Sequence, residues 1–358
     1  MAGAGKSYFV KLMALRSLLA GVDFLIVDPE DEYRAVCTAA DGQYVRLAAA
    51  SGQHLNPFDV PPAGTPADSV DPLAEQVAAL LGLLEVMLAE PGRALQTNER
   101  AILDRALYAT YAAAGITPDP HTHARPAPLL RDLHAVLRAM PGELTAGLAT
   151  RLERYVTGSL AAGLFAGPTN LALDRQLIVF NTQRLEEELR PLATHLIAGF
   201  VWHRVRRERR PRLLVIDEAW SLLRYPEGGA FISSMARRAR KYYLGLVTIT
   251  QDAADFLRSD HGRAVLVNAA MKLLLRQEPA TMDVVADAFQ LSDDERQSLL
   301  GAGKGEGLLI ARGARLALSI EASPAEHRLA TTAPRELAER AAAEPADGHA
   351  GGMHALRA

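Results

Sequence analysis

The residues that most constrain this chain lie at its start, where Gly5-Lys6-Ser7 opens a stretch of apolar residues at helical spacing from Tyr8 to Ala20. Small residues before a lysine let successive backbone N–H groups curl around a phosphate, and the helix N-terminus favours an anion. Lys6 would reach the β- and γ-phosphates, and the Ser7 hydroxyl would ligate Mg²⁺. Taken alone, the same residues also fit a flexible terminus. The pattern predicts a nucleotide-binding loop formed by Gly3, Ala4, Gly5, Lys6, Ser7 and Tyr8.

The loop differs from the full phosphate-loop pattern at its beginning. In G-x-x-x-x-G-K-[ST] the first glycine would stand one residue before Met1, and so would the strand that leads into such a loop. An empty slot in the centre of a sheet would leave unpaired backbone groups. We therefore expect the sequence to be a fragment truncated inside this motif, through a truncated reading frame, a wrongly assigned start or a decayed gene.

A second motif follows an apolar strand at 213–216. The strand ends in Asp217 and Glu218, a pattern typical of a Walker B element, in which Asp217 would hold Mg²⁺ through water and Glu218 would polarise the attacking water. Gln251 follows the next strand, at the sheet edge where open α/β folds bind ligands, and would sense the γ-phosphate. The alternative is a buried strand with a solvated acidic turn, followed by an ordinary polar residue at a strand end.

The order of strand and helix patterns predicts an α/β fold with a mostly parallel sheet whose first strand is missing. Strands are expected at 22–27, 43–47, 176–180, 213–216, 246–249 and 271–275, with a hairpin of 307–311 and 315–320 around Gly313. Helices are expected at 72–89, 97–114, 129–139, 143–157, 185–207 and 229–242. We expect a discontinuous core of residues 1–60 and 160–330, an all-helical insertion of residues 61–159, and a frayed helix with a flexible tail over 331–358.

Composition excludes several classes of protein. The 358 residues are 49% hydrophobic and 23% charged with a net charge of −3, which indicates a globular chain and excludes a polybasic nucleic-acid coat. The single cysteine, Cys37, excludes an internal disulfide and a multi-cysteine zinc site, and fits a reducing cytosol. We expect no membrane-spanning segment, because charged or polar residues interrupt the longest apolar run.

Further motifs carry a resemblance to a known family. In chain order they are Gly5-Lys6-Ser7, Asp28-Pro29-Glu30-Asp31-Glu32-Tyr33, Asn56-Pro57-Phe58-Asp59, Gly163-Leu164-Phe165, Pro168-Thr169-Asn170, Val179-Phe180-Asn181, Asp217-Glu218-Ala219-Trp220, Arg240-Lys241-Tyr242, Thr250-Gln251, Leu275-Arg276-Gln277 and Gly305-Glu306-Gly307. Over about residues 1–328 the chain resembles the motor domain of the TrbE/TraC-type ATPases of conjugation and type IV secretion, in the HerA–FtsK superfamily. The resemblance implies a RecA-like P-loop NTPase core with an all-helical insertion, ATP and Mg²⁺ as cofactors, and hexamer formation.

Roles follow from the same resemblance. Lys6 and Ser7 would bind phosphate and Mg²⁺, Asp217 and Glu218 would form the Walker B pair, and Gln251 would be the sensor. A ring ATPase also needs a cation from the neighbouring subunit. Arg276 is the first candidate for it, with Arg240 and Lys241 as alternatives, and each of the three also fits a solvated surface cation. Glu30, Glu32 and Tyr33 match a family motif to which no role is assigned.

The expected function is that of an ATP-hydrolysing motor, with channel proteins as partners and DNA as a further candidate partner. Such a motor works at the cytoplasmic side of an inner-membrane secretion channel, and we expect membrane contact only through partners. The alternatives are a DNA-pumping translocase of the same superfamily and a truncated remnant that binds nucleotide or partners without turnover. A second glycine-rich segment, 301–305, has Gly305 where a phosphate loop needs serine or threonine, and we predict a tight turn there.

Overall fold

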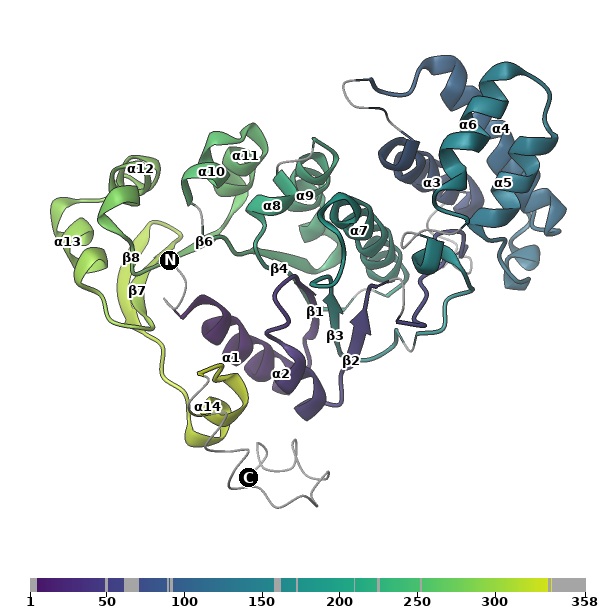
Figure 1. The fold of residues 1–358 in the computed structure, drawn as a ribbon. Coiled ribbons are helices and arrows are strands. Elements are labelled where there is room, and N and C mark those ends of the chain that lie inside the picture. The colour runs from purple at the N-terminus through teal and green to yellow at the C-terminus, as the bar shows by residue number, and fades with distance from the viewer. Residues whose placement is uncertain are drawn as a thin grey trace. The chain divides into compact units, whose positions relative to one another are not determined.

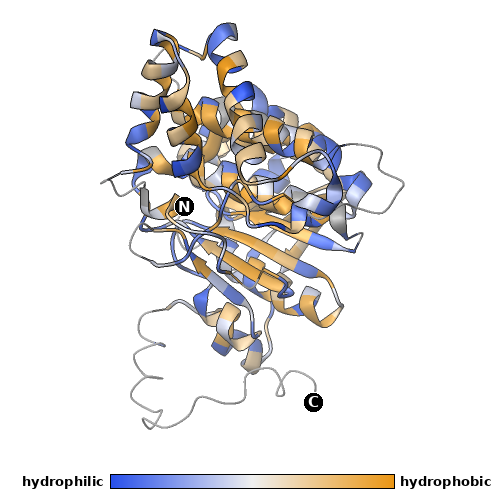
Figure 2. Cartoon of the chain, turned by 90° about the vertical axis from the view of Figure 1, so that its right-hand side faces the viewer, coloured by the Kyte–Doolittle hydropathy of each residue, from blue (hydrophilic) through white to orange (hydrophobic). Residues whose placement is uncertain are grey.

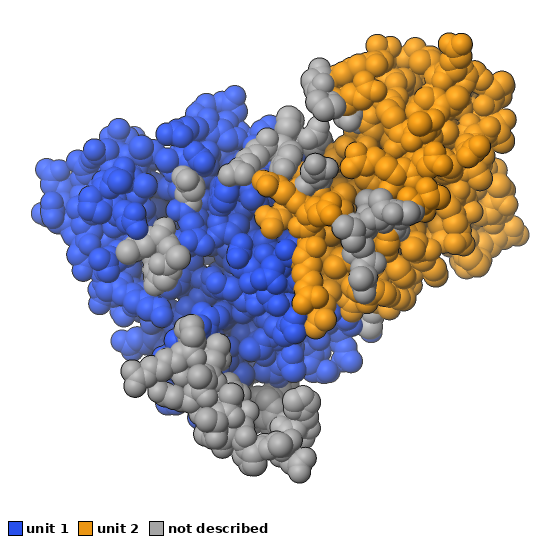
Figure 3. Space-filling model, viewed as in Figure 1, with its two compact units in different colours: residues 1–44, 173–183, 210–358 blue, residues 45–172, 184–209 orange. Residues whose placement is uncertain are grey.

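The computed structural model describes residues 5–48, 51–60, 71–88, 90, 93–157, 162–171, 173–208, 210–223, 226–251, 253–333 and 336. The chain forms two compact units, coloured separately in Figure 3. Unit 1 contains residues 1–44, 173–183 and 210–358, and unit 2 contains residues 45–172 and 184–209. Among the described residues, we find no helix with the length and apolarity that crossing a bilayer requires.

A five-stranded sheet forms the centre of unit 1, with the strand order β2-β3-β1-β4-β5 (Figure 1). The strands are β1 (Asp23–Asp28), β2 (Gln43–Arg46), β3 (Leu177–Asn181), β4 (Arg212–Ile216) and β5 (Leu244–Thr248). β1 pairs in parallel with both β3 and β4, and β4 pairs in parallel with β5. All six residues of β1 are buried, as expected for a central parallel strand covered on both faces, and the strands are hydrophobic along much of their length in Figure 2.

Two helices cover one face of this sheet, α1 (Lys6–Leu19) and α2 (Arg34–Ala39). Their apolar side chains form one core cluster with alternate residues of β1, such as Phe24 and Ile26. The chain then turns tightly at Gly42, where a Cβ would lie 2.9 Å from the Leu177 carbonyl oxygen, so a side chain at this position would push β3 away.

The other side of the sheet carries short helices, which are α8 (Trp220–Leu223), α9 (Pro226–Arg238), η4 (Ala239–Tyr242), α10 (Ala253–Arg258) and α11 (Asp260–Asn268). Beyond them lies a separate antiparallel sheet of β6 (Met271–Leu275), β7 (Glu306–Ala311) and β8 (Ala314–Ser319). The strand at 271–275 is therefore present but belongs to this second sheet. Arg312 and Gly313 both have positive φ, 48° and 83°, which suits the two-residue turn of the predicted hairpin.

The remaining helices of unit 1 are α12 (Pro279–Phe289), α13 (Asp293–Gly301) and α14 (Pro324–Ala330). α12 and α13 pack on the second sheet, whereas α14 packs on α1. Arg16 of α1 forms an ion pair with Glu326 at 2.7 Å. The buried Lys11 ammonium, also on α1, donates to the Ala330 carbonyl at 3.3 Å.

Unit 2 is helical. Its elements are α3 (Pro72–Leu88), α4 (Thr97–Ala113), η1 (Pro120–Ala124), α5 (Leu130–Ala139), α6 (Glu143–Glu153), η2 (Ala162–Phe165), η3 (Glu187–Leu189) and α7 (Arg190–Arg207). Within this unit α3 packs on both α4 and α7. The contacts place residues 45–60, 160–172 and 184–209 with the helices, whereas the sequence assigns these three segments to the core. The assignment of the units as ATPase core and inserted subdomain stays a prediction, and most of the tail expected over 331–358 lies outside the described residues.

Two sequence motifs without an assigned role, 56–59 and 168–170, are joined by hydrogen bonds in unit 2. The Asn56 N–H donates to the Thr169 hydroxyl oxygen at 2.8 Å, and that hydroxyl donates to the Asp59 carboxylate. The Asn170 amide oxygen accepts the His54 N–H at 2.8 Å, and its amide nitrogen donates to the Gly52 carbonyl at 2.8 Å. The segments before α3 and after α6 are thereby joined by side chain to main chain hydrogen bonds.

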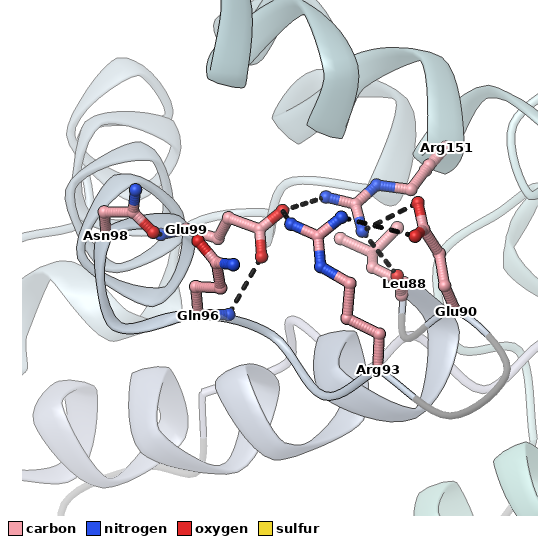
Figure 4. A network of polar contacts seen from close by, with 7 residues as sticks. All are labelled: Leu88, Glu90, Arg93, Gln96, Asn98, Glu99 and Arg151. Atoms are coloured by element: carbon pink, nitrogen blue, oxygen red, sulfur yellow. Dashed lines mark hydrogen bonds and ion pairs between the residues drawn. The ribbon is translucent and has the colours of Figure 1, made fainter.

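A buried carboxylate anchors the helices of unit 2 (Figure 4). Glu99 is 3% exposed and accepts the Gln96 N–H at 2.8 Å, which lowers its pKa together with the guanidinium of Arg151. Arg151 also donates to the Leu88 carbonyl at 2.9 Å. One guanidinium thus connects α6 to the start of α4 and the end of α3.

Replacing Arg151 with alanine is expected to destabilise the protein by about 2 kcal/mol, because the Glu99 carboxylate and the Leu88 carbonyl lose a charged donor. Chemical denaturation would measure this change. Arg100→Ala is the control, since Arg100 is 55% exposed and pairs with Glu85 at the surface, where such pairs contribute about 0–1 kcal/mol. Equal losses in the two variants would contradict the prediction.

Candidate nucleotide site

The N-terminus of α1, where the sequence predicts phosphate binding, begins at a glycine with positive φ. Gly5 caps the helix with a φ of 100°, a left-handed conformation that favours glycine, and Phe9 N–H donates to its carbonyl at 2.9 Å. A Cβ at Gly5 would lie 3.2 Å from the backbone nitrogen of Gly305. Of the segment 301–305, where the sequence predicts a tight turn, Lys304 and Gly305 form the turn, and Gly305 lies beside Gly5. Gly3 and Ala4 lie outside the described residues.

Lys6 lies close to the acidic pair that follows β4. Burial lowers the pKa of the Lys6 ammonium, and the negative charges of Glu218 and Asp217 oppose that change. Ser7, the next residue on α1, is half-buried. Tyr8 hydrogen-bonds through its hydroxyl to His327 Nδ1 on α14 at 2.9 Å, so its side chain contacts that helix.

Asp217 is a buried acid with two donors. Its Oδ2 accepts the Tyr33 hydroxyl at 2.8 Å, and its Oδ1 accepts the Glu218 N–H at 2.9 Å. Burial raises the pKa of Asp217 to about 6 in spite of these hydrogen bonds. The buried carboxylate therefore holds its charge at a cost that a bound cation would offset.

Glu218 is brought together with Gln251, as the sequence predicts. The Gln251 amide donates to Glu218 Oε1, and the indole N–H of Trp220 donates to Oε2. Glu218 also has a φ of 47°, in the left-handed region that residues with a Cβ rarely adopt. Lys6, Asp217, Glu218 and Gln251 thus gather at the N-terminus of α1 and the carboxyl ends of β4 and β5.

The motif after β1 explains how Tyr33 reaches Asp217. Asp28 Oδ1 accepts the N–H groups of Glu30 and Glu32 at 3.3 and 3.1 Å, and its Oδ2 accepts that of Tyr33 at 3.2 Å. This tight turn directs the fully buried Tyr33 ring under β4. The Lys11 ammonium lies 5.7 Å from the centre of that ring and 3.7 Å from Glu32 Oε2. The motif 28–33 therefore also supplies an anion and an aromatic ring to this buried ammonium.

Asp28 gives a pH dependence of stability. Burial raises its pKa from 3.8 to about 6, so the folded state binds more protons than the unfolded state between these values. The contribution of Asp28 is therefore present below pH 4 and lost as the pH rises through about 6. We expect the unfolding free energy of the wild type minus that of Asp28→Asn to fall by about 3 kcal/mol from pH 3 to pH 7 and then to stay constant. Urea unfolding at several pH values measures this difference, and a constant difference would contradict the prediction.

The three candidate cations do not join the cluster. Arg240 and Lys241 are exposed in η4, which precedes β5 and so lies at the amino end of that strand, opposite the edge with Glu218 and Gln251. Arg276 is exposed directly after β6, in the second sheet. All three therefore remain candidates only for action on a neighbouring subunit.

Comparisons with known proteins show what this chain is similar to. A family model described as the TraG P-loop domain matches residues 145–309. The solved structure of VirB4 from Thermoanaerobacter pseudethanolicus is 30% identical, with a TM-score of 0.78 over 91% of this chain and 89% of that one. The chain belongs to the VirB4/TraC family.

The VirB4/TraC-type chain is also similar to two further proteins. Protein TraC of Escherichia coli strain K12 is 25% identical over 295 residues, which are 77% of this chain and 31% of TraC, so the chain spans about a third of that relative. The plasmid coupling protein TrwB, solved with ADP and Mg²⁺, is 14% identical with a TM-score of 0.59 and shares the fold. The predicted family and the α/β fold of RecA-like P-loop NTPases are confirmed.

The sequence did not reveal the part of two aromatic residues in this VirB4/TraC-type site: Tyr33 has no role assigned from it, and Trp220 is interpreted from it as a core or subunit-contact residue. Tyr33 and Trp220 each donate to one acid of the pair. Their position in the sequence could have indicated a role at the site. Each aromatic residue ends an acidic motif that follows a strand, Tyr33 in 28–33 and Trp220 in 217–220.

Proposed function

We propose that this chain binds ATP with Mg²⁺ and hydrolyses it as the motor ATPase of conjugative DNA transfer or type IV secretion. One observation carries the proposal. Lys6 at the start of α1 faces the buried acids Asp217 and Glu218 at the end of β4, and the strand beside them supplies Gln251. Two carboxylates and a lysine at a helix N-terminus fit a triphosphate with its cation.

The residues divide the chemistry among them. The loop from Gly3 to Tyr8 would bind the phosphates, with Lys6 as their counter-charge. Ser7 and Asp217 would hold Mg²⁺, which neutralises phosphate charge when bound. The buried, acidic surroundings of Asp217 suit a divalent cation.

The other side chains act on water and on charge. Glu218 would orient the attacking water and accept its proton, and Gln251 would sense the γ-phosphate. Arg276, or alternatively Arg240 or Lys241, would stabilise transition-state charge from a neighbouring subunit. This last role requires a ring, and we propose a homo-hexamer.

The relatives support a proposal for the partners and the place of action. We propose that the chain works with the channel proteins of a secretion system and contacts a membrane only through them, at the cytoplasmic side of the inner membrane. The name of TrwB as a plasmid coupling protein and the match to TraC support a role in transfer, with DNA as a further candidate partner.

Lys6→Ala is expected to weaken the binding of a fluorescent ATP analogue at least ~10-fold and to abolish Mg²⁺-dependent phosphate release, because the phosphates lose a charged donor. Titration of the analogue and a phosphate assay measure both effects. Lys272→Ala, on β6 of the second sheet, is the control and should keep both properties. Equal binding by Lys6→Ala and the wild type would refute the proposed site.

A further inference from the structure

The carboxylate of Glu218 is fixed by two side chains from different elements. Trp220 Nε1–H donates to Oε2, and Gln251 Nε2–H donates to Oε1. Glu218 is 8% exposed, so little water competes for these oxygens. One donor at each oxygen defines both the position and the plane of the carboxylate.

The backbone around Trp220 is itself fixed. The Ser221 hydroxyl donates to the Glu218 carbonyl at 2.8 Å, and Ala219 N–H donates to the Ile249 carbonyl at 2.8 Å. The turn that begins α8 is therefore bound to the end of β5, the strand that leads to Gln251. The segments that carry Trp220 and Gln251, the two donors to Glu218, are therefore fixed relative to each other.

An indole N–H is well suited to this task. It donates one hydrogen bond and accepts none, and its ring is rigid, so it holds an anion without competing for the proton that a base must accept. A carboxylate acceptor makes the bond charge-assisted and about twice as strong as a neutral one. The left-handed φ of Glu218 shows that the surrounding structure imposes this arrangement on the backbone.

We propose that Trp220 is a positioning residue that orients Glu218 toward the attacking water. The inference rests on the proposed ATP hydrolysis. Trp220 acts through Glu218 and does not itself contact the nucleotide in this role. A misplacement of about 1 Å in a reacting group can cost about 100-fold in rate, so the orientation of this base matters.

The test separates the N–H from the ring. Trp220→Phe keeps an aromatic ring, and 3-benzothienylalanine at position 220 keeps the shape of tryptophan with sulfur in place of N–H. Both are expected to lower kcat at least ~10-fold while KM and the affinity for the fluorescent ATP analogue stay within ~2-fold. Trp220→His, which retains a ring N–H, should recover part of the loss. Trp202→Phe, in unit 2, is the control and should keep the wild-type kcat.

A second readout needs no turnover. The chain has two tryptophans, so a Trp202→Phe background leaves Trp220 as the sole source of indole fluorescence. Removing the carboxylate with Glu218→Ala is expected to shift the emission of Trp220. An unchanged emission would overturn the inference, and so would wild-type kcat in an active Trp220→Phe enzyme. If the wild-type chain hydrolysed no ATP, that result would contradict the proposed function, on which the positioning role depends.

Discussion

Replacing Glu218 with glutamine is expected to lower the rate of ATP turnover at least ~100-fold. Glutamine keeps the length and shape of the side chain but cannot accept a proton from water at neutral pH. Lys6, Ser7 and Asp217 remain in place, so the affinity for Mg²⁺-ATP should change by no more than a few fold. The loss should therefore appear in kcat and not in KM.

Steady-state kinetics and equilibrium binding of the fluorescent analogue would measure the two quantities separately. Glu30→Gln is a matched control, because Glu30 belongs to the acidic motif after β1 and is exposed. It should retain the wild-type kcat. Turnover in Glu218→Gln within a few fold of the wild type would show that another group activates the water.

Replacing Arg212 with methionine is expected to destabilise the protein by about 3 kcal/mol. The side chains of Arg212 and Asp23 are both fully buried, with Nε and Oδ2 3.2 Å apart, at the first residues of β4 and β1. Removing the guanidinium takes the fully buried partner from the Asp23 carboxylate, which also pairs with the half-exposed Arg210 at 3.7 Å. The cost comes mainly from the loss of this buried charge pair.

Denaturant unfolding would measure the change, with two further variants as controls. Arg210→Met should cost less than about 1 kcal/mol, because an exposed partner contributes little. The double variant Asp23→Leu with Arg212→Met should recover most of the loss, since no buried charge remains. A double variant as unstable as Arg212→Met alone would assign the loss to packing and contradict the electrostatic explanation.

Buried strands were the most predictable part of the fold. Apolar runs such as 213–216 have few other uses in a chain of this length, and the observed strands differ from the expected ones by one or two residues at most ends. Short helices were missed. α2 has six residues and shows no apolar period, whereas α13 carries a capping box of Ser292 and Glu295 that the sequence could have revealed.

Partnership between strands was less predictable. The sequence pattern of 271–275 is that of a buried strand, but nothing in it states which strand lies beside it. In the structure β6 pairs antiparallel with β7, which begins about thirty residues later in the chain. β6 is therefore not part of the parallel sheet. Long-range pairing is decided by packing of the whole unit and not by local propensity.

In the candidate site, too, some contacts could be predicted from the sequence and others could not. Glu218 and Gln251 could be placed together because neighbouring parallel strands bring their carboxyl ends to one edge. Tyr33 could not, because its hydroxyl meets an acid 184 residues away after a turn whose shape depends on Asp28. Trp220 reads as an ordinary core residue until the direction of its N–H is known.

Lys11 and the Ala330 carbonyl that it reaches are 319 residues apart. At about 5–20 residues per second, a ribosome would release α1 roughly 15–60 s before α14 is made. During that interval the Lys11 ammonium lacks its carbonyl acceptor, and β1 must wait for β3 and β4 to emerge from the ribosome. The packing of α1 on α14 therefore forms only once residue 330 has been made, whereas all of unit 2 has been synthesised by residue 209.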